Sequence, residues 1–117
     1  MSYEIYIFHS SVKDKIDSGI KLDAFEHCPI ETSEISLFIE RLHHYGYKQG
    51  QNSNEFFKNI DDCPIQVHIF NSEISFSVPY WEGADEAIIE AAQDASELAD
   101  SDNLIMFDPQ TEEWSTL

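Results

Sequence analysis

The chain has 117 residues, of which 42% are hydrophobic and 13% aromatic, enough to bury one core but not two. We therefore expect a single domain over residues 1–117. Its 23 acidic side chains against six Lys and Arg give a formal net charge of −17. Nucleic acid and anionic membranes are bound by cationic surfaces, so this balance argues against both partners and favours a basic protein.

The charge is unevenly distributed, because Lys58 is the last basic residue. Residues 1–58 hold nine acidic and six basic side chains, a net charge of −3, whereas residues 59–117 hold fourteen acidic side chains and no Lys or Arg. The second half of the chain is therefore expected to present a field of one sign.

Cysteine content and the N-terminal segment favour a cytoplasmic location. Two cysteines, Cys28 and Cys63, are too few for a disulfide framework and are compatible with reduced thiols. The first residues, MSYEIYIFHSSVKDK, lack the basic and apolar regions of a signal peptide, and no apolar run approaches membrane-spanning length. We expect a soluble cytoplasmic protein.

In chain order, the first predicted element is a strand over residues 3–9, YEIYIFH, which is apolar on both faces and therefore expected inside its sheet. A short helix over residues 12–17 follows, with Gly19 as its stop. A second helix begins at Thr32 or Ser33 and ends at Gly46. Its apolar stripe consists of Ile35, Phe38, Ile39, Leu42 and Tyr45.

Three strands are predicted next, a weak one over residues 55–60 and two clear ones over residues 64–70 and 73–80. The clear pair alternates apolar and polar residues, which predicts one buried and one wet face. Only Asn71 and Ser72 separate them, so they are expected to form a hairpin.

An acidic helix after Gly83 and a final strand over residues 103–107 complete the predicted order, roughly β-α-α-β-β-β-α-β. This order predicts an α+β fold in which helices pack on a largely antiparallel sheet.

The acidic helix is amphipathic. Its apolar stripe consists of Ala84, Ala87, Ile88, Ala91, Ala92, Ala95 and Leu98, and the acids expected to face solvent are Asp85, Glu86, Glu90, Asp94 and Glu97. Several acids are like-charge i,i+4 pairs or lie near the C-terminal end of the helix dipole, so local stability does not explain them. Two explanations remain open, a solvated face that maintains solubility and an acidic surface that meets a basic protein.

Three aromatic residues accompany this acidic segment. Tyr80 and Trp81 precede the helix and Trp114 lies in the acidic tail, a composition typical of interface anchors with a charged rim. Alternatively, Tyr80 and Trp81 fasten the strand-to-helix turn onto the core and Trp114 covers a sheet edge.

Catalytic and metal-binding signals are weak. His43 and His44 are adjacent on a predicted helix and point about 100° apart, whereas one metal ion is better served by i,i+4 spacing. No CxxC, GxSxG, HExxH or glycine-rich phosphate loop occurs. We expect no enzymatic activity, metal or cofactor; a small enzyme that uses its histidines would reveal itself by bound metal.

The chain resembles the small acidic immunity proteins of bacterial polymorphic and contact-dependent toxin systems. The features that carry the resemblance are the opening strand in MSYEIYIF, the PYW loop before an Ala-rich acidic helix, and a closing strand that runs into FDPQT. The resemblance implies a tight, non-covalent inhibitor of one cognate toxin, often a basic nuclease, which agrees with the charge argument.

The expected partner-binding residues are Asp61, Asp62, Tyr80, Trp81, Glu86, Glu90, Asp94, Glu97, Asp100 and Asp102. The alternative function is that of a DNA mimic or adaptor whose acidic face engages a nucleic-acid-binding host protein.

Overall fold

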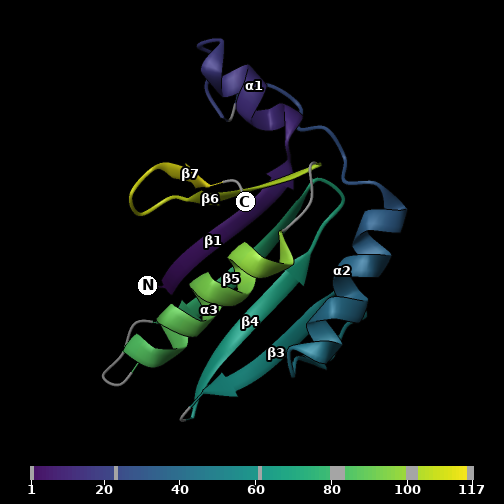
Figure 1. The fold of residues 1–117 in the computed structure, drawn as a ribbon, viewed down its shortest axis with the longest axis vertical. Coiled ribbons are helices and arrows are strands. Elements are labelled where there is room, and N and C mark those ends of the chain that lie inside the picture. Colours follow the sequence, from purple (N-terminus) through teal and green to yellow (C-terminus); the bar gives the residue numbers. More distant parts are fainter. Residues whose placement is uncertain (1, 23, 61, 80–83, 100–102, 116–117) are drawn as a thin grey trace.

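The structure is a computed structural model that describes residues 2–22, 24–60, 62–79, 84–99 and 103–115 (Figure 1). Five of the expected partner-binding residues lie outside the described residues: Asp61, Tyr80, Trp81, Asp100 and Asp102.

The described elements follow the predicted order with two additional short strands. They are β1 (Ser2–His9), α1 (Ser11–Asp17), α2 (Thr32–His44), β2 (Lys48–Gln49), β3 (Glu55–Ile60), β4 (Cys63–Ile69), β5 (Glu73–Pro79), α3 (Asp85–Leu98), β6 (Leu104–Asp108) and β7 (Glu113–Ser115). The fold is α+β, as predicted. The two strands that the sequence did not indicate are β2 and β7.

All the described strands join one antiparallel sheet in the order β2-β3-β4-β5-β1-β6-β7. The first strand lies between β5 and β6, so its predicted interior position is confirmed. The predicted hairpin of β4 and β5 is also confirmed: Ile69 pairs with Ile74, and the Phe70 N–H donates to the Glu73 carbonyl at 2.8 Å.

Two of the predicted helix stops involve glycines with left-handed backbone conformations. Gly19 after α1 has a φ of 97° and Gly46 after α2 has a φ of 91°. Residues with a Cβ rarely adopt such angles, which is why a glycine ends each helix there.

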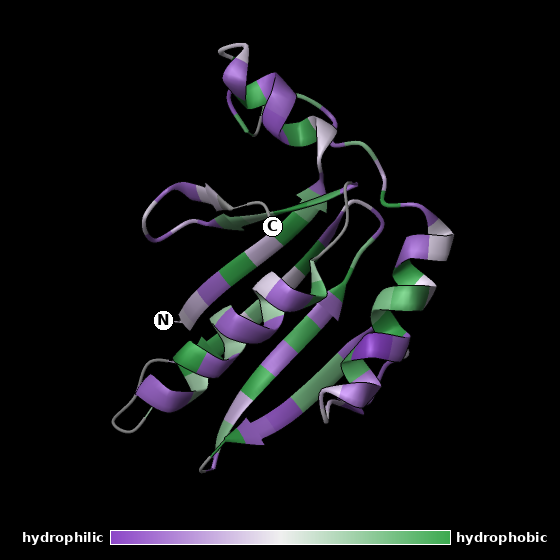
Figure 2. Ribbon diagram, in the orientation of Figure 1, coloured by the Kyte–Doolittle hydropathy of each residue, from purple (hydrophilic) through white to green (hydrophobic). Residues whose placement is uncertain are grey.

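The main core lies between the sheet and the two longer helices, which cover the same face (Figure 1). The stripe of α3 reaches this core through Ala87, Ala91 and Ala95, all fully buried, so the small side chains let the helix lie close to the strands. Helix α2 contributes Phe38 and Leu42. Figure 2 shows the alternation of hydrophobic and hydrophilic residues along β4 that places one strand face in this core.

A smaller cluster covers part of the opposite face of the sheet. Phe8 from β1 and Ile105 from β6 pack with Val12 of α1, and Trp114 on β7 lies against Phe107, ring centroids 4.5 Å apart. This contact explains why the acidic tail returns as a strand. Among the described residues, no helix is both long and apolar enough to cross a bilayer.

Candidate functional site

The outer face of α3, which we define as Asp85, Glu86, Ile89, Gln93 and Glu97, is exposed along the length of the helix. Ile89 is 66% exposed, the largest exposed fraction among the large apolar side chains in the described part of the chain. Ile89 was not among the expected binding residues, because the prediction for this helix covered only its apolar stripe and its acidic residues. Together with the surrounding carboxylates, Ile89 has the arrangement of an apolar interface centre with a charged rim.

The expectation that Asp94 faces solvent was wrong. Its exposed fraction is 4%, and it lies on the inner side of α3 toward the sheet. The spacing accounts for this position, because Asp94 follows Ala91 by three residues and precedes Leu98 by four, which places all three on one helix face. Glu90 is half-buried rather than exposed.

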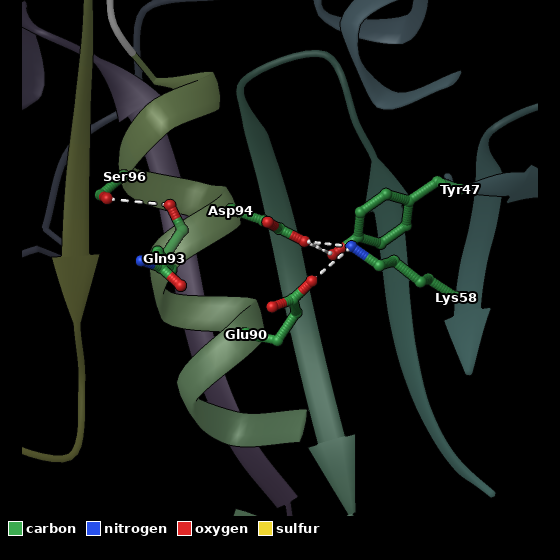
Figure 3. Close-up of polar contacts among 6 residues, drawn as sticks. All are labelled: Tyr47, Lys58, Glu90, Gln93, Asp94 and Ser96. Carbon is green, nitrogen blue, oxygen red and sulfur yellow. Dashed lines mark hydrogen bonds and ion pairs between the residues drawn. The ribbon is translucent and has the colours of Figure 1, made fainter. Parts of the chain in front are cut away.

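Lys58 of β3 forms ion pairs with both acids on this inner side (Figure 3). Its Nζ donates to Glu90 Oε2 at 2.7 Å and to Asp94 Oδ2 at 3.0 Å. The Tyr47 hydroxyl also donates to Asp94 Oδ2, at 2.9 Å, and Lys58 Nζ lies 5.2 Å from the centroid of the Tyr47 ring. The like-charge pair predicted on the helix is therefore held together by a cation from the sheet.

The environment of this network shifts three pKa values. Burial raises the pKa of Asp94 above its ordinary value, although the hydrogen bonds from Lys58 and Tyr47 oppose the shift. Burial alone lowers the pKa of Lys58, but Glu90 and Asp94 outweigh it and raise the pKa overall. Burial and the Asp94 charge raise the pKa of Tyr47 far above its ordinary value, so Tyr47 stays a neutral donor.

Arg41 of α2 stabilises the C-terminal end of α3. Its Nη2 donates to the Glu97 carbonyl at 2.7 Å and its Nη1 to the Leu98 carbonyl at 3.2 Å. These carbonyls belong to the last turn, where the helix dipole favours a cation. The unfavourable acidic C-terminus expected from the sequence is therefore compensated from a neighbouring helix.

The expected site residues separate into three groups. Glu86 and Glu97 share the outer face of α3, whereas Glu90 and Asp94 meet on Lys58. Asp62 is exposed but lies on another element, in the turn between β3 and β4, with a φ of 67°. The structure therefore leaves Glu86 and Glu97 as the predicted residues on the outer face.

Three of the histidines, His27, His43 and His68, pack against aromatic rings. The His43 ring lies edge-on to Phe56, with centroids 5.7 Å apart, and His68 is stacked on Phe70 at 6.2 Å. Within the described ranges, no cluster of three or more His, Cys, Asp or Glu side chains has a geometry that could hold a metal ion.

The outer face of α3 is suited to non-covalent binding of a cationic surface, because carboxylates there surround one apolar side chain. Comparisons with protein-family models, curated proteins and solved structures found no match to this chain.

Proposed function

We propose that this chain is a cytoplasmic immunity protein that binds and neutralises a cognate basic bacterial toxin. The observation that carries the proposal is the outer face of α3, where Asp85, Glu86 and Glu97 are exposed around the apolar Ile89. The net charge of −17 makes the whole molecule attractive to a cationic partner.

Two basic side chains hold α3 in place beneath this surface. Lys58 binds the inner side of α3 and Arg41 its C-terminal carbonyls. The helix is thereby fixed to the sheet and to α2, so its outer carboxylates are presented on a rigid element. Rigid presentation lowers the ordering entropy that a partner has to overcome on binding.

Charge and apolar contact contribute to different steps of the proposed binding. The carboxylates steer a basic partner and raise its association rate. Ile89 then enters a pocket on the partner and slows dissociation. On a nuclease toxin, the Lys and Arg side chains that hold nucleic-acid phosphate are the cations that this surface suits, and covering them blocks the substrate.

A pull-down with tagged protein tests the proposal, at low and then high salt, followed by co-expression of each captured protein with this chain. Support consists of one basic protein in stoichiometric amount whose toxicity this chain suppresses. Capture of several nucleic-acid-binding host proteins, all released by salt, would instead favour the DNA-mimic function. Capture of nothing would leave the acids as a solvated face.

Charge reversal then tests the face itself. Glu86→Lys combined with Glu97→Lys should lower the association rate about tenfold or more at low salt, with a smaller effect at high salt. The matched control is Asp14→Lys combined with Glu113→Lys, which changes the net charge equally at two exposed acids on α1 and β7. Equal effects of the two double variants would show that net charge, rather than this face, governs binding.

A further inference from the structure

A groove lies on the face of the sheet opposite α2 and α3. It is lined mainly by Tyr6, Phe8, Leu22, Phe25, His27 and Glu73, and its volume is about 670 Å³. Tyr6 and Phe8 lie on the face of β1 that points away from the main core, and Phe8 pairs with Glu73 of β5. The segment between α1 and α2 supplies the other wall. The volume is within the range of about 300–1,000 Å³ that small-molecule sites occupy.

Aromatic rings form the walls of this groove. The His27 ring lies 5.0 Å from Phe25 and 5.1 Å from Phe8, centroid to centroid, and its Nε2 is 2.7 Å from the Leu22 carbonyl oxygen. That carbonyl can only accept, so Nε2 carries the proton and the ring is held in place. Phe8 is buried, whereas Tyr6 and Phe25 are part-exposed, so these two rings are the ones that can attract a cation through the ring quadrupole.

Carboxylates give the groove a negative charge. Glu73 is half-buried, and the Tyr6 hydroxyl donates to Glu4 Oε2 at 3.2 Å beside it on β1. The pKa of Glu73 is raised overall. Burial is the main cause and the neighbouring Glu4 adds to it, whereas His27 opposes the shift. None of the described residues that line the groove is Lys or Arg. The chain thus supplies no strong cation of its own to the lining, and an external cation would relieve the cost of burying the Glu73 charge.

We propose that this groove receives an arginine side chain of the basic partner, which stacks on the aromatic walls and donates to Glu73. This inference rests on the proposed function. A guanidinium suits the site better than an ammonium, because it is planar, weakly hydrated and able to donate two parallel hydrogen bonds to one carboxylate. Since α3 covers the other face of the sheet, the arginine comes from a segment of the partner distinct from the one at α3.

The first test uses the full chain and N-acetyl-arginine amide, with N-acetyl-lysine amide as the comparison, in an NMR titration. Saturable shifts confined to the aromatic resonances of Tyr6, Phe8, Phe25 and His27, with weaker binding of the lysine compound, are expected. Glu73→Gln should weaken arginine binding about tenfold, because a charge-assisted hydrogen bond is lost. Glu40→Gln is the control, because Glu40 is exposed on α2 and lies outside both proposed binding surfaces, and it should leave arginine binding unchanged.

Phe25→Ala is the second variant. Phe25 belongs to the segment that connects α1 to α2 and not to the sheet, so its truncation spares the main core. It should also weaken arginine binding, through loss of one aromatic face. Shifts that do not saturate, or an affinity that neither Glu73→Gln nor Phe25→Ala alters, would overturn the proposal.

Binding of the captured basic partner separates this inference from the proposed function. If Glu73→Gln weakens partner binding several-fold, and its effect adds to that of Glu97→Gln, the groove proposal and the proposed function are both supported. If the partner binds Glu73→Gln as tightly as the unchanged chain, the groove proposal fails while immunity remains. If no basic toxin partner exists but the arginine compound still binds through Glu73, the proposed function fails and the groove is a cation site without this occupant.

Discussion

Lys58 Nζ on β3 and Asp94 Oδ2 on α3 lie 3.0 Å apart, and this pair connects the last cation of the sequence to the acidic helix. The first half of the chain therefore supplies a cation to the second half, which has no Lys or Arg of its own. A buried carboxylate is tolerated only when it is paired and hydrogen-bonded, and here Lys58 and the Tyr47 hydroxyl meet that requirement.

Lys58→Met should lower the free energy of unfolding by about 3 kcal/mol, because it leaves the Asp94 carboxylate buried without a cation. The loss should be smaller at pH 5 than at pH 7, since burial already raises the pKa of Asp94 and protonation removes the charge. Urea denaturation at the two pH values measures both effects. Adding Asp94→Asn should recover more than half of the loss, because the amide oxygen can still accept from Tyr47.

The control for this change is Lys48→Met, since Lys48 is exposed on β2. An exposed substitution is expected to stay within about 0.5 kcal/mol. Equal destabilisation by the two lysine variants would mean that net charge, and not the buried pair, determines the result.

Arg41→Ala should destabilise the last turn of α3, because two carbonyls at the negative end of the helix dipole lose the hydrogen bonds from the guanidinium. We expect the free energy of unfolding to fall by about 1–2 kcal/mol. Amide hydrogen exchange should accelerate more in the last turn of α3 than in its middle. Arg41→Lys should give an intermediate loss, as an ammonium lacks the planar fork. Uniform acceleration of exchange along α3 would contradict a capping role.

Alkaline pH should destabilise the fold through the same network. The folded state raises the pKa of Tyr47 and of Lys58, so above about pH 10 it holds protons that the unfolded chain has lost. The free energy of unfolding is therefore expected to be flat from neutral pH to about 10 and to fall above it. Tyr47→Phe should make the fall shallower. Urea unfolding between pH 8 and 11 checks the slope, and an unchanged slope in Tyr47→Phe would exclude Tyr47 as a source.

Periodicity predicted the larger elements because their pattern follows directly from burial. The alternation along β4 and β5 and the stripe of α2 each reflect one buried face, and Gly19 and Gly46 occupy backbone positions that favour glycine. The strands β2 and β7 are two and three residues long, too short to show a period. These two strands form because of contacts with distant parts of the chain, such as the packing of Trp114 on Phe107.

The roles of the individual acids of α3 were harder to predict, because all of them were expected to face solvent. Asp94 lies at helical spacing from Ala91 and Leu98, which are on the apolar stripe, so its burial could have been read from the sequence. Its partner could not, since the contact between Lys58 and Asp94 depends on which strand α3 crosses. The exposure of Ile89 could also have been predicted from the sequence, because Ile89 lies outside the apolar stripe that packs on the sheet.

Ile89→Ser should separate binding from folding. Because Ile89 is 66% exposed, the free energy of unfolding is expected to change by no more than about 0.5 kcal/mol. Affinity for the proposed basic partner should fall about tenfold, chiefly through faster dissociation, since an anchor acts after docking whereas Glu97→Lys acts on association. Leu37→Ser is the matched control, because Leu37 is 53% exposed on α2 and outside the outer face of α3. Binding kinetics with immobilised partner measure both rates, and an unchanged dissociation rate in Ile89→Ser would remove the anchor while leaving the carboxylates to account for recognition.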